Sequence, residues 1–337
     1  MNNNNPLRIK LFSLSIILIL INILPTSCYA FDLNDREIFD FSLIGNTIYV
    51  DDNYNSSIPG WGEDRFNKVQ LAIDKASDGD TIIVYNGTYF ENVLINKSIN
   101  LSGENKHGTI IDSSNSGRVI RITKNGVFVS GFTLTNSGNY VEDSGVYIES
   151  YNNYIHDNII LQNQNGFYIK DSKSNRIIYN TIQDNNYAIY LINSDFNFLV
   201  ENIIEDNKYG VYIQESSAND INGNVLENNE IGLWLKLYCT DNSIAGNMIT
   251  RNTNLGFLMD RFCYNNIIHN NNFIKNKIHA SFTMSFLNNW HYNYWDNWIG
   301  LIVEEYRIFP KGIFGQIFGP IPWINFDLYP LYEPYST

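Results

Sequence analysis

The sequence predicts an all-β protein, a right-handed parallel β-helix with three short strands in each coil of about 22 residues. Three observations predict this fold: asparagines at a fixed spacing, apolar residues two positions after two of them, and one longer apolar segment per repeat. Apolar residues that alternate with other residues over very short runs are typical of strands with one buried face.

Asparagine recurs in three columns, each with six members, and successive members are 22, 22, 22, 23 and 24 residues apart. The columns are Asn153, Asn175, Asn197, Asn219, Asn242 and Asn266; Asn158, Asn180, Asn202, Asn224, Asn247 and Asn271; and Asn163, Asn185, Asn207, Asn229, Asn252 and Asn276. Asparagine tolerates the left-handed backbone of sharp corners, and stacked amides can bond to the coils above and below. The columns therefore indicate architecture rather than binding.

The apolar positions predict the strands themselves. Two residues after the first and second asparagines stand Ile155, Ile177, Leu199, Ile221, Ile244 and Ile268, and Ile160, Ile182, Ile204, Leu226, Ile249 and Phe273. The third segment begins at Gly145, Gly166, Ala188, Gly210, Gly232 and Gly256, and we expect it to be the longest strand. A helical solenoid does not fit, because no stretch after residue 80 has ten residues of 3.6 periodicity.

The ends of the chain predict export and two caps. Residues 1–30 resemble a secretory signal peptide cut after Ala30, with a retained N-terminal anchor as the alternative. Residues 45–298 form the predicted β-helix domain, and residues 299–337 a C-terminal cap or tail. A helix over residues 65–77, with Phe66, Val69, Ile73 and Ala76 on one face, should cover the N-terminal end of the core. We expect no membrane-spanning segment in the mature chain.

The charge, the sequons and the cysteines indicate which partners, modifications and cross-links are possible. The net charge of −13 argues against nucleic acid and suits a secreted or cell-surface protein, which we expect to be a monomer. Asn55, Asn86, Asn96 and Asn100 begin Asn-x-Ser/Thr sequons that could carry glycans. Cys239 and Cys263 occupy equivalent positions of adjacent coils, so either a disulfide or two buried thiols is expected.

The opening segment carries a family resemblance. Its core is AID-x-A-x-x-GDTI-x-V-x-x-GTY-x-ENV-x-I, it is followed by the Asn-x-Ile coils, and the repeats close on NYWDNW. Over residues 47–298 the chain resembles NosD-type β-helix proteins and the carbohydrate-binding and sugar-hydrolase (CASH) β-helix families. The resemblance implies a secreted, archaeal-like protein, and the family name implies copper handling. The catalytic motifs of pectin methylesterases and polygalacturonases are missing.

Two sets of side chains are candidate sites. Five rings at the third position of the long strand should point outward and stack as an exposed ladder that could bind a polysaccharide or surface glycan: Tyr147, Tyr168, Tyr190, Tyr212 and Trp234. The same stacking could simply stabilise the sheet. Asp171 and Glu215 lie two coils apart, roughly 9.6 Å from the strand spacing, at the edge of the range for a glycosidase pair.

The sequence therefore favours a non-catalytic carbohydrate-recognition or structural role, with no cofactor. A polysaccharide-cleaving hydrolase or lyase is one alternative, and a NosD-like periplasmic copper-binding accessory protein is another. Copper or calcium would need converging ligands, and we identify no metal site, because the histidines, among them His156 and His269, do not cluster in the sequence.

Overall fold

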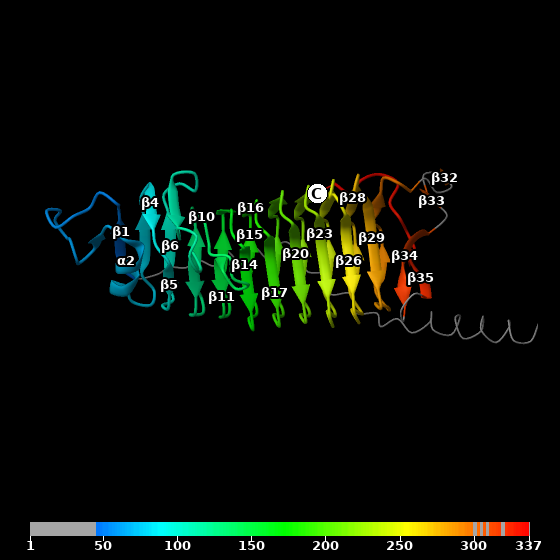
Figure 1. The fold of residues 1–337 in the computed structure, drawn as a ribbon, viewed down its shortest axis with the longest axis horizontal. Helices are drawn as coiled ribbons and strands as arrows, with labels where there is room; N and C mark the ends of the chain where they lie inside the picture. Colours follow the sequence, from blue (N-terminus) through cyan, green and yellow to red (C-terminus); the bar gives the residue numbers. More distant parts are fainter. Residues whose placement is uncertain (1–44, 299–301, 304–305, 308–309, 318–320, 337) are drawn as a thin grey trace, which may run out of the picture. The chain divides into compact units, whose positions relative to one another are not determined.

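The computed structural model describes residues 45–298, 302–303, 306–307, 310–317 and 321–336. The predicted signal peptide lies outside these residues. From residue 45 onward the strands stack into a parallel β-helix of about ten coils (Figure 1), which confirms the predicted fold class.

Each coil contributes one strand to each of three faces, because sharp corners divide the repeat at the predicted points. The long face contains β5 (Val93–Ile95), β8 (Ile120–Ile122), β11 (Ser144–Ile148), β14 (Asn165–Lys170), β17 (Tyr187–Ile192), β20 (Tyr209–Gln214), β23 (Ile231–Lys236), β26 (Leu255–Asp260), β29 (Ile278–Thr283) and β34 (Lys311–Ile317). Neighbouring strands of this face, β5 to β29, pair in parallel and in register, as do β29 and β34.

The other two faces are built from shorter strands. The first short face contains β1 (Thr47–Val50), β3 (Thr81–Val84), β6 (Asn100–Gly103), β9 (Phe128–Ser130), β12 (Tyr154–His156), β15 (Arg176–Ile178), β18 (Phe198–Val200), β21 (Asp220–Asn222), β24 (Ser243–Ala245), β27 (Ile267–His269), β30 (Asn289–His291) and β35 (Ile321–Asp327). The second short face contains β4 (Gly87–Phe90), β7 (Thr109–Asp112), β10 (Thr133–Thr135), β13 (Ile159–Leu161), β16 (Thr181–Gln183), β19 (Ile203–Glu205), β22 (Val225–Glu227), β25 (Met248–Thr250), β28 (Asn272–Ile274) and β31 (Tyr294–Trp295).

The core is the inside of the coil stack. The predicted inward residues, such as Ile155, Ile160 and Ile177, are fully buried, and in β12, β13 and β15 they alternate with half-buried residues. Because equivalent residues of successive coils stack on one another, the core is continuous along the axis.

The asparagine columns form buried hydrogen-bond ladders. The backbone N–H and the Nδ2 of Asn180 both donate to Oδ1 of Asn202, at 3.0 and 3.2 Å, and Nδ2 of Asn202 donates to the Ile177 carbonyl at 2.7 Å. The pattern repeats from coil to coil in all three columns. Each amide thus satisfies corner N–H groups that are closed to water, which confirms the architectural prediction.

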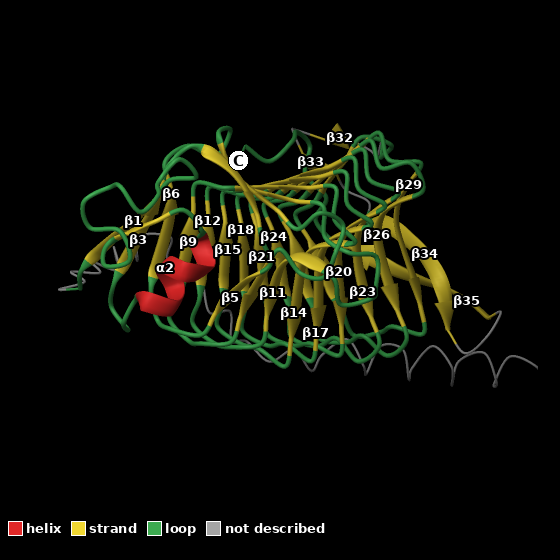
Figure 2. Ribbon diagram, turned by 60° about the vertical axis from the view of Figure 1, so that its left-hand side comes forward, coloured by secondary structure: helices red, strands yellow, loops and turns green. Residues whose placement is uncertain are grey.

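The N-terminal cap is shorter than predicted. The helix α2 spans only Val69–Lys75 (Figure 2). Arg65–Phe66 form strand β2, which pairs with β1. The Glu91 carboxylate accepts the N–H groups of Val69 and Gln70, at 2.9 and 3.0 Å, and fixes the start of the helix. Phe66, Val69, Ile73 and Ala76 are all buried, as the sequence indicates.

The described part of the C-terminal segment pairs with the last coils. Strands β34 and β35 form an antiparallel hairpin, and they also pair in parallel with β29 and β30. Strands β32 (Ile302–Val303) and β33 (Tyr306–Arg307) form a second small antiparallel pair. Further on, the backbone of Tyr335 exchanges two hydrogen bonds with the Asn272 side chain. Within the described residues, no helix has the length and apolar character to cross a membrane.

Candidate functional site

The five rings of the long face line up as the sequence predicts. Tyr147, Tyr168, Tyr190 and Tyr212 pair in register strand by strand, and Tyr212 pairs with Trp234. The first two rings are parallel, with centroids 5.5 Å apart. The following pairs meet edge to face, at 5.0, 4.6 and 5.1 Å. We call this set the ring ladder.

The expectation that the ring ladder is exposed is wrong for most of it. Tyr147, Tyr168 and Tyr212 are only 3, 4 and 4 % exposed, and Tyr190 and Trp234 are half-buried. The rings point away from the core, but each one covers the next, so few ring faces remain for a sugar.

Side chains outside the ladder complete the cover. A second ring column, Tyr187 and Tyr209, packs beside Tyr190 and Tyr212. The Arg118 guanidinium lies 4.0 Å from the Tyr147 centroid. Burial raises the pKa of Tyr190 to about 12 and raises the pKa of Tyr212 further. The arrangement stabilises the sheet, as same-face ring neighbours do.

The two candidate catalytic carboxylates lie on corners rather than in a cleft. Asp171 and Glu215 directly follow β14 and β20, and both are exposed residues with left-handed backbones. Glu215 accepts a hydrogen bond from Gln214 at 3.0 Å. Asn193 occupies the same position on the coil between them, and neither carboxylate lines the hollows described below.

One acidic residue that the sequence interpretation missed is Asp220. It lies on the outer side of β21, and burial raises its pKa to about 6. The residues that pair with it on adjacent coils are Phe198 and Ser243. Its column carries no other carboxylate among β12 to β30, and this could have drawn attention to it.

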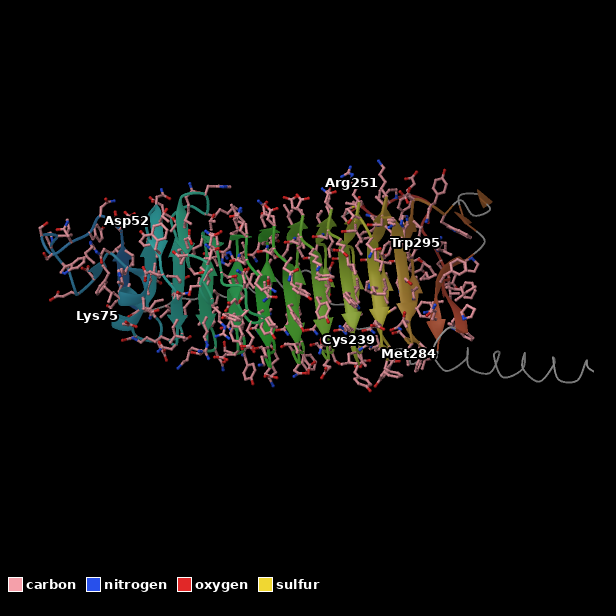
Figure 3. All side chains as sticks on the ribbon, in the orientation of Figure 1. Asp52, Lys75, Cys239, Arg251, Met284 and Trp295 are labelled. Carbon is pink, nitrogen blue, oxygen red and sulfur yellow. The ribbon has the colours of Figure 1, made fainter. Side chains whose placement is uncertain are left out.

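A second group of aromatic side chains, some exposed and some half-buried, lies on another part of the surface. Tyr238, Phe262, Tyr264, Phe286 and Leu287 line a shallow hollow of about 520 Å³ at the corners that follow the long strands β23, β26 and β29. Tyr238, Tyr264 and Leu287 are 56, 40 and 66 % exposed, and the rings of Tyr238 and Phe262 stack at 5.5 Å. Cys239 and Met284, labelled in Figure 3, lie on the same corners. We call this surface the aromatic corner.

A one-residue insertion creates the aromatic corner. Gln214 pairs with Lys236, yet the next buried corner residue is two positions away in one coil, at Ser216, and three in the other, at Cys239. The extra residue gives two consecutive left-handed residues, Leu237 and Tyr238, and it turns the ring outward. The change from a 22- to a 23-residue spacing was the sequence signal of this insertion.

The two cysteines belong to a fourth column that the sequence interpretation missed. This column contains buried hydroxyls and thiols at one corner: Ser172, Ser194, Ser216, Cys239, Cys263 and Ser285. Both thiols are free in the structure, although they lie within hydrogen-bond reach of each other. Burial raises the pKa of the Cys239 thiol, whose Sγ is 3.2 Å from the Ile213 carbonyl oxygen. The predicted proximity is present, and the disulfide is not formed.

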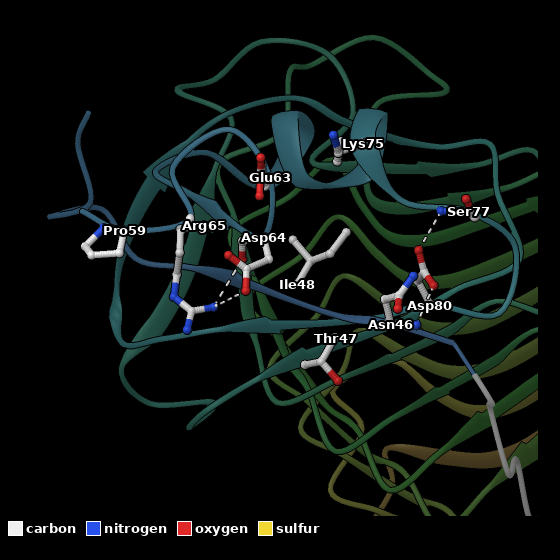
Figure 4. A pocket seen from close by; sticks show the side chains of 11 residues that line it. Asn46, Thr47, Ile48, Pro59, Glu63, Asp64, Arg65, Lys75, Ser77 and Asp80 are labelled. Atoms are coloured by element: carbon white, nitrogen blue, oxygen red, sulfur yellow. Dashed lines mark hydrogen bonds and ion pairs between the residues drawn. The ribbon is translucent and has the colours of Figure 1, made fainter. Parts of the chain in front are cut away.

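A polar hollow of about 710 Å³ lies at the N-terminal end (Figure 4). Two of the three carboxylates that line it, Asp64 and Asp80, are engaged in local contacts. Asp80 accepts the backbone N–H groups of Asn46 and Ser77, both at 2.7 Å, and Asp64 pairs with Arg65 at 3.0 Å. These contacts close the first coil, so the hollow is explained by the cap.

The described residues do not fit a copper centre. His269 and His291 stack in parallel on adjacent coils with centroids 5.2 Å apart, and burial lowers the pKa of both. However, no group of three or more His, Cys, Asp or Glu side chains within the described ranges could hold a metal ion. His156 lies in the same column as His269 but five coils away.

Fold and site together define the protein as a parallel β-helix with an aromatic surface. The model of the family described as "Periplasmic copper-binding protein (NosD)" matches residues 73–231 and 208–300, which together are more than half of the chain. The chain belongs to this NosD family.

Relatives and similar folds are more distant. A cell surface glycoprotein of Methanothermus fervidus is 39 % identical over 87 residues, which are 25 % of this chain and 14 % of that protein. XylC in complex with xylose has a similar fold, with a TM-score of 0.52 and 12 % identity, over 73 % of this chain and 68 % of that one. The C387A mutant of DFA-IIIase from Arthrobacter chlorophenolicus A6, in complex with DFA-III, has a TM-score of 0.50 and 15 % identity, over 74 % and 84 % of the two chains.

Proposed function

We propose that this protein is an extracytoplasmic, non-catalytic carbohydrate-binding β-helix, and that the aromatic corner is its binding surface. The observation that carries the proposal is the exposure of Tyr238 and Tyr264, 56 and 40 %, on a rigid coil stack. Sugar rings stack on aromatic faces while the phenol hydroxyls stay in water. The family description and the cell-surface relative support an extracytoplasmic location.

The setting of these rings favours binding over packing. The ring ladder is explained by the burial of its rings, whereas Tyr238 and Tyr264 of the aromatic corner are exposed, and Tyr238, with its neighbour Phe262, has a left-handed backbone. Bulky residues in that conformation cost about 1–3 kcal/mol each, which suits a surface maintained for a role other than stability. Arg261 and Asp241 are exposed on the same corners and offer hydrogen bonds to sugar hydroxyls.

The enzyme and copper alternatives have weaker support. A cleaving enzyme needs two carboxylates on either side of one bound sugar, and Asp171 and Glu215 flank neither hollow. A copper site needs converging ligands, and the described residues bring no three together. New reducing ends from a polysaccharide, or stoichiometric metal in the native protein by mass spectrometry, would revive one or the other.

The test is a glycan array with the exported chain. We expect Tyr238→Ala combined with Tyr264→Ala to abolish retention and to change the melting temperature little, because both side chains are exposed. The matched control is Phe90→Ala with Tyr140→Ala, two exposed rings at the other end of the stack, which should retain binding. Full retention by the Tyr238/Tyr264 variant would remove the aromatic corner as the site, and no retention of the parent protein on any glycan would remove the function.

A further inference from the structure

The four sequons lie in very different structural settings. All four fall between residues 55 and 100, in the first coils, and none begins at an asparagine of the three columns. In the first two asparagine columns a sequon is excluded, because the residue two positions later points into the core, as Ile155 does after Asn153. The N-terminal sequons are free of this constraint, so their settings can be compared directly.

The Asn55 sequon is the most accessible of the four. Asn55, Ser56 and Ser57 are all exposed, and they lie in the segment between β1 and β2 that belongs to no strand (Figure 1). Both the N–H and the hydroxyl of Ser57 donate to Oδ1 of Asn55, at 3.0 and 2.6 Å. These two bonds hold the Ser57 hydroxyl beside the Asn55 amide, and Nδ2 lies at the surface, where it donates to the Asn53 carbonyl at 3.3 Å.

The Asn100 sequon is at the opposite extreme. Asn100 begins β6, which pairs with β3 on one side and β9 on the other. Leu101, the middle residue of the sequon, is fully buried in the core. No enzyme can bind this segment in an extended form unless the sheet opens.

The other two sequons are intermediate. Asn86 and Thr88 are exposed, but Thr88 is part of β4, which pairs with β7. Asn96 is exposed as well, but its Ser98 is fixed: the N–H donates to Asp78 at 2.8 Å and the hydroxyl to the Gly126 carbonyl at 3.0 Å.

We propose that Asn55 is an N-glycosylation site of the folded protein and that Asn100 is not modified. In the transfer, Nδ2 of Asn55 attacks the anomeric carbon of a sugar carried on a lipid diphosphate. The new C–N bond replaces the sugar–oxygen bond, the lipid diphosphate leaves with the electron pair, and the proton lost from the amide balances the charge of the leaving diphosphate. The proposal requires export, but it does not depend on glycan binding at the aromatic corner.

A glycan at Asn55 would lie at the N-terminal end of the stack. Among the described strands, β4 is the last strand of the second short face at this end, so one of its edges has no partner strand. A bulky hydrophilic group near an open edge disfavours pairing with another chain. The modification therefore fits a role in keeping the protein apart from other copies at a crowded surface.

The experiment is glycopeptide mass spectrometry on the full chain, exported from a host that glycosylates Asn-x-Ser/Thr sequons outside the cytoplasm. We expect a glycan on the Asn55 peptide and none on the Asn100 peptide. Asn55→Gln and Ser57→Ala should each remove it, because one lacks the acceptor and the other the sequon hydroxyl. Asn53→Gln, two positions earlier and outside any sequon, should leave it in place.

Two outcomes would overturn the proposal. The first is an unmodified Asn55 in exported protein, whether or not another sequon is modified. The second is occupancy of Asn100 equal to that of Asn55, which would show that the sugar is transferred before the coils form and that the folded geometry does not select the site.

Discussion

The first coils and the coils that contain the asparagine columns fill the same buried corner position with different side chains. In the column of Asn158, Asn180 and Asn202, the preceding coil has Phe132, which is also fully buried. The backbone N–H of Phe132 donates to Oδ1 of Asn158 at 3.1 Å, so this asparagine column begins at the Phe132 backbone. A buried corner position can therefore be filled either by a hydrogen-bonded amide or by an apolar ring.

What the two regions share is the backbone just before that corner. The preceding residue is left-handed in each case: Gly131 before Phe132, Asp157 before Asn158 and Tyr179 before Asn180. Glycine is required in the first coils, because a Cβ on Gly131 would lie 2.3 Å from the Gly103 carbonyl oxygen. The ladder coils use non-glycine residues at a cost of about 1–2 kcal/mol each, and the amide bonds, about 0.5–1.5 kcal/mol apiece, offset it.

The largest expected effect comes from removing one ladder amide. In Asn229→Ala, the N–H and Nδ2 of Asn207 lose their shared acceptor, 3.0 and 3.1 Å away, in a corner closed to water. We expect a loss of roughly 3–5 kcal/mol in the free energy of unfolding, measured by urea denaturation. The control is Asn228→Ala, the adjacent exposed asparagine, which should cost about 1 kcal/mol or less. Equal losses in the two variants would mean that the ladder bonds add no stability.

A slightly smaller loss in the free energy of unfolding is expected when the ring at this corner is replaced by an amide. Phe132→Asn places an amide where the first coils have a ring, and it leaves a void beside Gly103, whose Cβ position is 3.2 Å from the ring. We expect a loss of roughly 2–4 kcal/mol, because the new amide can reach Asn158 but cannot fill the space. If denaturation shows no loss, the two kinds of corner are interchangeable and the contrast between the regions disappears.

Most of the ladder region could be predicted from the sequence, because each coil repeats the same local rule. The asparagines, the inward residues such as Ile155 and the alignment of the ring ladder all follow from the period. The burial of Tyr212 could not be predicted, since its cover comes partly from Tyr187, which lies outside the ring ladder. The helix was predicted too long because Arg65 and Phe66 pair with β1, a contact that helical periodicity does not reveal.

The residue that ends the second asparagine column also could not be predicted from the sequence. Asn293 donates its N–H and Nδ2 to Asp327, 34 residues later, where the period has ended. A carboxylate can only accept, so it closes a ladder whose amides all donate in this direction. The aromatic corner escaped for a similar reason, since it depends on one inserted residue rather than on the repeat.

The asparagine column that begins at Phe132 ends at Asp327, a titratable group, so the stability of this end should depend on pH. Burial raises the pKa of Asp327, although the Trp295 and Asn293 donors oppose the shift. Because the folded-state pKa lies above the unfolded one, this group's contribution to stability is full below the unfolded pKa and is lost as the pH rises through the folded pKa. We expect the difference in unfolding free energy between the parent and Asp327→Asn to shift in favour of Asn as the pH rises from 3 to 8. A difference that stays constant across urea titrations in this range would contradict the assignment.

The smallest change in the free energy of unfolding is expected at the cysteines. There, thiols replace the hydroxyls of the fourth column in the same buried corner position. The N–H groups of Ser172 and Ser194 donate to the next hydroxyl of the column, at 3.1 and 2.9 Å, and the Cys239 thiol receives the N–H of Ser216 in the same way. Cys239→Ser should therefore keep the bond and change the free energy of unfolding by less than about 1 kcal/mol, whereas Cys239→Val should cost about 1–3 kcal/mol by leaving that N–H unpaired.

Since both thiols are free, a reductant should leave the melting temperature of the parent protein unchanged. A reductant that lowers it in the parent but not in Cys239→Ser would instead show that the two coils are joined by a disulfide.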